Sequence, residues 1–533
     1  MSNLLGTIVG GSLTEGLTMR IGPQTNLEQL KTGKFVSIQG ESQRFFCLLT
    51  NLTLEVTHSD ILLFPPGHHE HLLKKALRSK DIYATAQLRP MLVLTNEGKP
   101  SPVKTIPPHF APVHDATKKD IALIFGNEQD ATKRYFSIGA PLDMDAAVCI
   151  DLDKLTERSN GIFGKTGTGK TFLTRLVLSG LIHHDKAVNI IFDMHSEYGL
   201  QARKEGSHGS FVKGLKTLFP DKVAIFSLDP ESTRRRGGMP DVELSLSYSS
   251  IAVEDIISLD TELNLNETAY EAAYLIAAKY KKRWLEVFLS QGDTLKEFAQ
   301  EIGAHPESIA ALYRKLKTIE RFPFLQKNAP STEDVIEKMM EYIQRGISII
   351  IEFGNFTSTF CYLLIANIIT RRIHSLYIKK TEQFLGSQRA GDEPKKLMIT
   401  IEEAHKFLNA QAARQTIFGT IAREMRKYYV SLLVVDQRPS GIDSEILSQI
   451  GTKIVAQLND EKDINAVLTG VNNAAQFRTV LAGLETKKQV ILLGHAIAMP
   501  IVIQTREYDE AFYTAVMHPF SVRSIDQLIQ DLF

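Results

Sequence analysis

The first 115 residues alternate short apolar stretches with turn residues. The stretches have the length and the β-branched and aromatic content of strands, and they cover 6–9, 17–21, 35–38, 44–49, 52–56 and 91–94. Glycine and proline punctuate them, for example at Gly10 and Gly11 and at Pro65 and Pro66. Many short strands at close spacing are typical of a small barrel or sandwich. We therefore expect residues 1–115 to form an N-terminal β-barrel that serves assembly or docking.

Beyond residue 115 the pattern changes to strands alternating with helices. The apolar run 187–192 ends in Asp193, as expected of a buried parallel strand whose carboxyl end faces a ligand. Residues 253–345 have an apolar period near 3.6, which predicts helices over 267–282 and 306–320. Strand patterns then return at 347–353, 397–402, 431–436, 453–458, 489–493 and 501–505. The expected order is a first α/β part (116–252), a helical insertion (253–345), a second α/β part (346–506) and an amphipathic C-terminal brace (507–533).

Composition narrows the class of protein without naming a function. The chain has 533 residues, 43% of them apolar, and 61 basic residues balance 61 acidic ones. Any contact with nucleic acid must therefore come from a local basic surface. The three cysteines are far apart and fit neither a disulfide framework nor a metal motif. No apolar run reaches the ~18 residues of a membrane span, and the N-terminus lacks the features of a secretory signal. We expect a cytoplasmic protein with buried thiols.

Residues 164–171 read GKTGTGKT and fit G-x-x-x-x-G-K-[ST], the phosphate-binding P-loop. Its glycines let successive backbone N–H groups point at phosphates, while Lys170 reaches the β- and γ-phosphates and the Thr171 hydroxyl binds Mg²⁺. An apolar strand end precedes the loop, and an apolar helical pattern over 172–181 follows it, which directs a helix N-terminus at the phosphates. The expected ATP contacts are Gly164, Lys165, Thr166, Gly167, Thr168, Gly169, Lys170, Thr171 and Phe172.

A second strand supplies the acidic partner that a P-loop needs. The run 396–401 places Glu402 at a strand end, where it can hold Mg²⁺, and Glu403 follows, where it can orient or deprotonate the attacking water. The alternative is a solvated acidic pair after a core strand. The next strand ends near Gln437, our candidate for sensing the γ-phosphate. The alternative there is a plain turn that Pro439 terminates.

Two arginines lie between these strands on one face of a predicted helix. Arg423 and Arg426 are three residues apart, so one of them could act as an arginine finger on the nucleotide of a neighbouring subunit. The alternative is a pair of surface arginines that bind nearby acids. Basic stretches at Arg203–Lys204 and at Arg234–Arg236 are candidates for DNA contact, or are solvated loops.

The set of motifs resembles the HerA-type ATPases of the HerA/FtsK superfamily. The residues that carry the resemblance are GKTGTGKT at 164–171, DMHSEYG at 193–199, IEEAHKF at 401–407, IAREMRKY at 421–428 and DQRPS at 436–440. It implies an α/β fold: a RecA-like P-loop ATPase core with an N-terminal small β-barrel of the HAS type and an inserted helical subdomain.

The resemblance also implies an activity. Members form homohexameric rings that move double-stranded DNA with ATP, and they work with a nuclease, often of the NurA type, in DNA end processing, or with an effector in anti-phage defence. By this analogy Glu403 is the catalytic base, Gln437 senses, one of Arg423 and Arg426 acts across the interface, and Arg506 is a basic position near the nucleotide. The usual first acid of the pair is aspartate, whereas this chain has Glu402. The alternative function is an assembly scaffold that ATP regulates, with the barrel as its docking platform.

Overall fold

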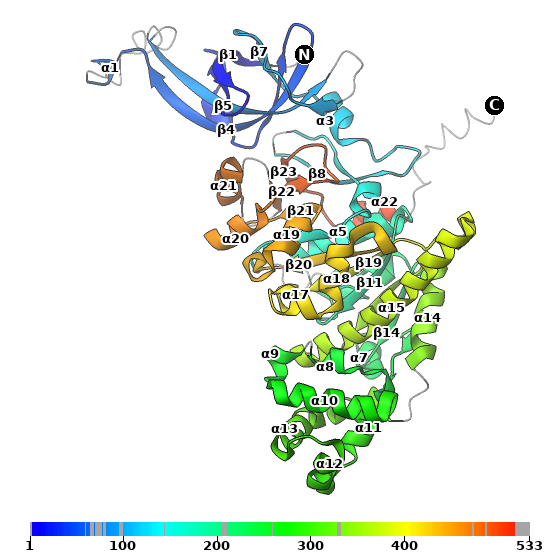
Figure 1. The fold of residues 1–533 in the computed structure, drawn as a ribbon. Coiled ribbons are helices and arrows are strands. Elements are labelled where there is room, and N and C mark those ends of the chain that lie inside the picture. Colours follow the sequence, from blue (N-terminus) through cyan, green and yellow to red (C-terminus); the bar gives the residue numbers. More distant parts are fainter. Residues whose placement is uncertain are drawn as a thin grey trace, which may run out of the picture. The chain divides into compact units, whose positions relative to one another are not determined.

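The computed structural model describes residues 3–58, 60–63, 69, 77, 81–94, 100–142, 144–203, 211–257, 259–327, 332–471, 474–485 and 488–517. Figure 1 shows the helices and strands of the chain, which divides into two compact units. The first comprises Met1–Leu152 and Thr452–Arg506, and the second Asp153–Gly451 and Glu507–Phe533.

A closed barrel of six strands forms the N-terminal part of the first unit. Its strands are β1 (Leu4–Ser12), β2 (Gly16–Ile21), β3 (Phe35–Gln39), β4 (Arg44–Val56), β5 (Ile82–Leu94) and β7 (Pro112–Asp115). They follow the order β2-β1-β7-β3-β4-β5, and pairing of β2 with β5 closes the ring, while β6 (Pro100–Pro102) adds to β5. Side chains of alternate residues, such as Leu17, Met19 and Ile21 of β2, fill the interior. Of the two architectures that the pattern allowed, the chain adopts the barrel.

Two of the expected barrel strands are one strand in the structure. The stretches 44–49 and 52–56 both belong to β4, whose pairing with β5 shifts register between Leu49 and Asn51. Such a bulge inserts an unpaired residue without ending the strand, so the polar residues Thr50 and Asn51 interrupt the apolar pattern but not β4. The barrel then leads into α3 (Lys118–Phe125), whose buried Asp120 binds Arg44 of β4 through two hydrogen bonds of 2.7 and 2.8 Å.

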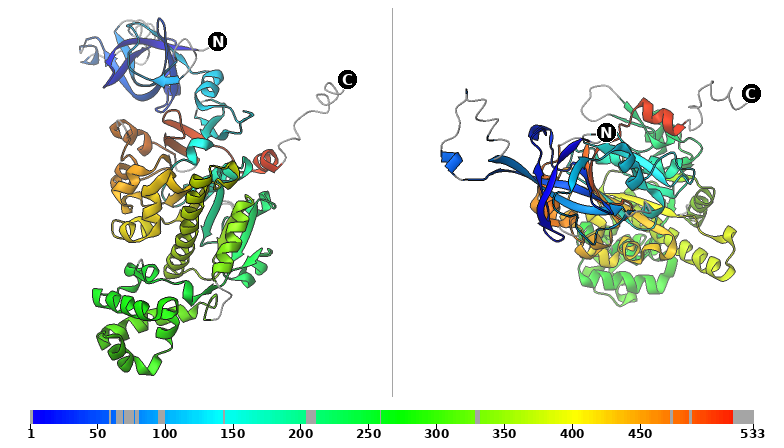
Figure 2. Two further views of the ribbon diagram at one scale, coloured as in Figure 1. Left: turned by 45° about the vertical axis from the view of Figure 1, so that its right-hand side comes forward. Right: turned by 90° about the horizontal axis from the view of Figure 1, so that it is seen from above.

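The remainder of the first unit contains an antiparallel sheet. Its order is β21 (Thr452–Val455), β22 (Gln489–Gly494), β23 (Ile501–Thr505), β8 (Tyr135–Pro141) and β9 (Val148–Asp151). Helices α20 (Glu461–Val467) and α21 (Ala474–Ala482) belong to the same unit. Figure 2 shows these elements from two further directions.

Parallel strands form the centre of the second unit. The order is β15 (Val242–Glu243), β14 (Val223–Ser227), β18 (Ser348–Glu352), β11 (Val188–Asp193), β19 (Leu397–Glu402), β20 (Val430–Asp436) and β10 (Asn160–Phe163). Each neighbouring pair in this series is parallel. Their near-continuous apolar sequences are typical of parallel strands buried on both faces. All their carboxyl ends therefore meet at one edge, where four neighbouring strands end in Glu352, Asp193, Glu402 and Asp436.

Helices complete this α/β unit. They include α5 (Lys170–His183), α7 (Pro230–Arg235), α14 (Thr332–Gln344), α15 (Thr359–Ser387), α18 (Ile417–Glu424) and α19 (Ser444–Gln449). The long α15 lies beside α14 (Figures 1 and 2). Its first two turns are almost entirely buried, which explains the apolar run 361–369. The short α22 (Glu510–Met517) packs on α6 (Leu215–Leu218), and residues 518–533 of the expected brace lie outside the described residues.

The segment between β15 and β18 is mainly helical. It contains α8 (Val253–Ile257), α9 (Asp260–Leu263), α10 (Glu267–Tyr280), α11 (Trp284–Leu289), α12 (Leu295–Ile302) and α13 (Pro306–Leu316). The expected helix over 267–282 ends at Tyr280 because Lys281 has a left-handed φ of 52°. In this helical segment the ring of Phe298 stacks on those of Tyr280 and Phe288.

Two further expectations concern the whole chain. Cys47, Cys149 and Cys361 are buried free thiols, as the sequence predicts. Among the described helices, none combines the length and the apolar content that crossing a bilayer requires.

Candidate functional site

The P-loop joins a buried strand to a helix at the carboxyl edge of the parallel sheet. Phe163 at the end of β10 pairs with Asp436 of β20, and α5 begins at Lys170. Gly167 and Gly169 have φ values of 79° and 86°, which lie in the region that favours glycine. The Lys170 ammonium folds back and donates to the Lys165 carbonyl over 3.1 Å. Loop and helix N-terminus thus have the form of an anion-binding site.

Glu402 and Glu403 lie at the end of β19, between β11 and β20. Glu402 is half-buried, and its Oε1 accepts a 2.6 Å hydrogen bond from the Tyr198 hydroxyl. Tyr362 instead contacts its main chain, with Oη 3.0 Å from the Glu402 nitrogen and 3.2 Å from its carbonyl oxygen. Glu403 has a φ of 49°, an unusual left-handed conformation for a non-glycine residue that often marks a functional position.

Gln437 connects the P-loop with Glu403. Its Oε1 accepts a 2.5 Å hydrogen bond from the Thr166 hydroxyl, and its Nε2 donates to the two Glu403 oxygens over 3.1 and 3.3 Å. The P-loop, the acidic pair and the strand end at Gln437 therefore meet in one chain of side-chain contacts, although Thr166 and Gln437 are 271 residues apart in the sequence. The structure brings together the loop, the acid and the polar strand-end residue that the sequence singled out.

Negative charge is concentrated at this edge of the sheet. Burial raises the pKa of Glu402 to about 7, against the lowering effect of the Tyr198 hydrogen bond. Burial and the neighbouring Glu352 raise the pKa of Asp193 to about 7 as well. Lys170 lies close enough to lower the pKa of Glu402. Buried carboxylates that repel one another favour a bound cation, which would relieve both effects.

His405 and Asp436 form a further pair beside Glu403. The imidazole Nδ1 lies 3.0 Å from Asp436 Oδ2 and 3.7 Å from Glu403 Oε2, and the His405 backbone N–H donates to Asp436 over 2.6 Å. The hydrogen bond from the ring to Asp436 raises the pKa of His405 above its ordinary 6.5. Asp436 thus fixes the orientation of the turn that carries Glu403.

This pair predicts a pH-dependent contribution to stability. Because the folded pKa of His405 is raised, the contribution is complete below the unfolded pKa and is lost as pH rises through the folded pKa. We expect the melting-temperature difference between wild type and His405→Asn to be largest near pH 6 and to shrink toward about pH 9. Thermal melts of both proteins across this range measure it. A difference that is the same at every pH would show that the ion pair contributes nothing.

The candidate arginines are placed differently from one another. Arg423 in α18 donates to the Ala413 carbonyl over 2.8 Å and lies 3.7 Å from Glu445 Oε2, so its guanidinium is held within its own chain. Arg426 is part of the 3₁₀ turn η7 (Met425–Tyr428), and its side chain lies outside the described residues. Arg506 belongs to the other unit, where it binds Glu128 over 2.8 Å and the Ser137 carbonyl over 3.2 Å.

The other predicted residues are Phe172, which follows the P-loop, and the two basic stretches that are candidates for DNA contact. The Phe172 ring makes an edge-on contact with Tyr508, with centroids 5.6 Å apart. In the basic stretch after β14, Arg234 pairs with Glu243 and Arg236 with Glu352, whereas Arg235 is exposed. The Arg203 side chain and Lys204 lie outside the described residues.

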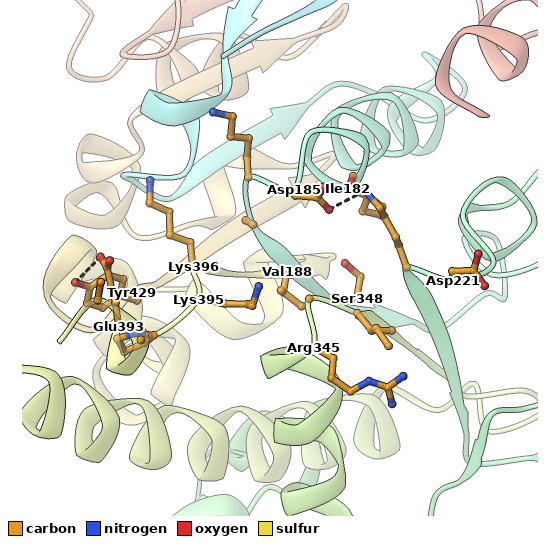
Figure 3. A pocket seen from close by; sticks show the side chains of 18 residues that line it. Ile182, Asp185, Val188, Asp221, Arg345, Ser348, Glu393, Lys395, Lys396 and Tyr429 are labelled. Carbon is orange, nitrogen blue, oxygen red and sulfur yellow. Dashed lines mark hydrogen bonds and ion pairs between the residues drawn. The ribbon is translucent and has the colours of Figure 1, made fainter. Parts of the chain in front are cut away.

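A separate pocket opens at the opposite, amino edge of the parallel strands (Figure 3). It has a volume of about 710 Å³ and is lined among others by Lys222, Arg345, Lys395, Lys396 and Tyr429. Lys222 is paired with Asp185 over 2.7 Å. Because ligands of open α/β sheets bind outside the carboxyl ends of the strands, this basic pocket is not the nucleotide site.

Sequence reasoning missed the buried partners of the acidic residues. Tyr198, Tyr362 and Glu352 contact or neighbour Glu402 and Asp193, but each reads locally as part of an apolar run or a turn. A usable signal for Glu352 existed, because the apolar run 347–353 contains this single acid. Tyr198 belongs to the DMHSEYG stretch that carries the resemblance, but nothing in that stretch indicated that its partner is Glu402.

Comparison with known proteins places the chain among helicase sequences. A model of the family described as "Helicase HerA, central domain" matches residues 136–373. The chain is similar to the DNA double-strand break repair helicase HerA of Sulfurisphaera tokodaii, with 25% identity over 95% of this chain and 93% of that protein. It is 23% identical to the protein of the same name from Pyrococcus furiosus, over 75% of this chain and 73% of that protein. Among solved structures, VirB4 of Thermoanaerobacter pseudethanolicus has a TM-score of 0.44 and 14% identity, covering 71% of this chain and 98% of that chain.

Proposed function

We propose that this chain, which matches the HerA central-domain model over residues 136–373 and is 25% identical to a HerA helicase over 95% of its length, is an ATP-driven translocase of double-stranded DNA that works as a hexameric ring. The observation that carries this proposal is the contact chain Thr166–Gln437–Glu403 beside Lys170. It joins a phosphate-binding loop to a base and a polar sensor, which are the parts that hydrolysis of a nucleoside triphosphate requires.

The chain's own residues have distinct tasks in this proposal. The backbone of Gly164–Thr171, with Phe172 beside it, binds the phosphates, and Lys170 leaves the Lys165 carbonyl to contact the γ-phosphate. Glu403 accepts a proton from the attacking water. Gln437 senses the γ-phosphate. Its amide bridges the loop and Glu403, so it must rearrange when phosphate enters between them.

Thr171 and Glu402 suit a magnesium ion. Tyr198 holds Oε1 of Glu402, while Oε2 makes no hydrogen bond to any residue in the described ranges. A carboxylate oxygen and a hydroxyl are ligands that Mg²⁺ accepts. Thr171 and Glu402 would hold the ion, which would supply positive charge to neutralise the phosphates. The longer side chain of glutamate, in place of the usual aspartate, is compatible with this role because Tyr198 restrains it.

We assign the arginine finger to Arg423 or Arg426, acting on the nucleotide of a neighbouring subunit, and keep Arg506 as a basic group near the nucleotide. A mixing experiment tests the finger. Glu403→Gln and Arg426→Ala subunits should each be inactive alone, but a mixed ring contains interfaces with an intact Glu403 and an intact Arg426. We expect mixing to restore measurable ATP turnover. If mixing restores nothing, Arg426 is not the finger, and the same experiment with Arg423→Ala tests the other residue.

The proposed partners come from the resemblance to the HerA-type ATPases. The proteins that the chain resembles are named DNA double-strand break repair helicases. We propose that this ring acts on duplex DNA in DNA end processing together with a NurA-type nuclease, or in anti-phage defence with an effector, and that the barrel docks the partner. ATP turnover with and without duplex DNA tests the proposal. Strong stimulation supports a translocase, whereas turnover that ignores DNA and instead follows complex assembly supports a regulated scaffold.

A further inference from the structure

The turn after β11 is anchored by a buried carboxylate. Asp193 ends this strand and is fully buried. Its Oδ1 accepts the backbone N–H of Glu197 and its Oδ2 that of Tyr198, both over 2.8 Å. Between them, Ser196 has a left-handed φ of 56°. Residues 193–199, which we call the tyrosine turn, therefore have a conformation that Asp193 determines.

The tyrosine turn contacts the proposed magnesium ligand on one side. The Tyr198 ring is fully buried, and its hydroxyl donates 2.6 Å to Oε1 of Glu402. Hydrogen bonds that a carboxylate accepts are shorter and stronger than those between neutral groups. The Glu402 side chain can therefore move only if Tyr198 follows it or this bond breaks.

On its other side the same turn packs against Glu352 of β18. A Cβ added to Gly199 would lie only 2.4 Å from Glu352 Oε1, so turn and carboxylate are in close contact. That oxygen is buried and has no hydrogen-bond partner among the described residues. The other oxygen, Oε2, accepts hydrogen bonds from Thr233 over 2.8 Å and from Arg236 over 2.6 Å. Arg236 is part of the basic stretch 234–236 and about one third exposed.

We propose that Tyr198 is a positioning residue for Glu402, and that the tyrosine turn carries displacement of Glu402 through Glu352 to Arg236. The inference rests on the proposed function, since it requires that nucleotide and Mg²⁺ bind beside Glu402. When nucleotide and Mg²⁺ attract the Glu402 carboxylate, Tyr198 and the tyrosine turn move with it. The distance between Gly199 and Glu352 then changes, and the exposure of the Arg236 guanidinium changes as a result. A basic surface segment thereby responds to the nucleotide through buried contacts within one subunit.

Hydrogen–deuterium exchange of the full chain tests this coupling. We expect Mg²⁺ and a non-hydrolysable ATP analogue to change exchange in wild-type peptides that cover 193–200 and 230–238. In Tyr198→Phe the analogue should still bind, but the change at 230–238 should be lost. Tyr362→Phe is the matched control, because it also removes a buried hydroxyl next to Glu402, but one that contacts only the main chain. It should retain the change.

A second variant covers the case in which Tyr198→Phe fails to fold. Gly199→Ala places a methyl group against Glu352 and should also remove the nucleotide-dependent change at 230–238. Its control is Gly386→Ala, where the added Cβ meets nothing within 4 Å. If both test variants respond at 230–238 as wild type does, the coupling is refuted. If wild type itself fails to bind the analogue, the proposed function is wrong, and the two failures are thus distinguishable.

Discussion

Lys170→Ala should abolish ATP hydrolysis. The ammonium stands at the first residue of α5, where it adds a full positive charge to the N–H groups of the loop. The transferred phosphoryl group concentrates negative charge at this point in the transition state, and removing one such preorganised contact costs on the order of 10²- to 10³-fold in rate. Phosphate release by the purified chain, with and without duplex DNA, measures the loss.

Lys165→Ala is the matched control for this variant. Lys165 lies in the same loop, and its main-chain carbonyl, which alanine keeps, accepts the hydrogen bonds from Lys170 and Thr168. We expect it to retain much more activity than Lys170→Ala. Normal hydrolysis by Lys170→Ala would mean that residues 164–171 are not the phosphate site.

Glu403→Gln should separate nucleotide binding from hydrolysis. Glutamine has nearly the same shape, so the loop and the magnesium ligands stay in place, but it cannot accept a proton from water. General-base catalysis by a positioned side chain contributes about 10²- to 10⁴-fold, and we expect turnover to fall within this range. Binding of a fluorescent ATP analogue, measured beside phosphate release, should be nearly unchanged.

The contacts around Glu403 make this test specific. Gln437 donates to both carboxylate oxygens, so the substitution disturbs one amide partner and not the fold of the strand. Glu393→Gln is a suitable control, because that exposed glutamate accepts a hydrogen bond from Tyr429 at the other edge of the sheet. If Glu403→Gln turns over ATP at the rate of Glu393→Gln, the base is another residue.

The local sequence pattern was sufficient to predict the strands and the loop that carry the site residues. The apolar runs before Glu402 and Gln437 and the glycine loop before Lys170 are each contained in about ten residues, and parallel strands bring their ends together without further information. Closure of the barrel could not be predicted from local patterns. It depends on pairing of Leu17 with Leu88, which nothing in either strand's own periodicity specifies.

The same limit explains the tyrosine turn. Asp193, Tyr198 and Glu352 were visible as residues, but their contacts depend on which strands become neighbours in the sheet. Strand order is a property of the whole chain, in which β18 and β19 flank β11 although they follow it by more than 150 residues. The side-chain environment of a buried acid therefore came from the structure alone.

ATP hydrolysis is proposed to move this protein along duplex DNA. The most direct measurement is displacement of a labelled third strand from a triplex, because a protein that moves along the duplex removes that strand without having to separate the other two. We predict ATP-dependent release by wild type and none by Lys170→Ala. Retention of the third strand by a wild-type protein that hydrolyses ATP on the same DNA would contradict the account.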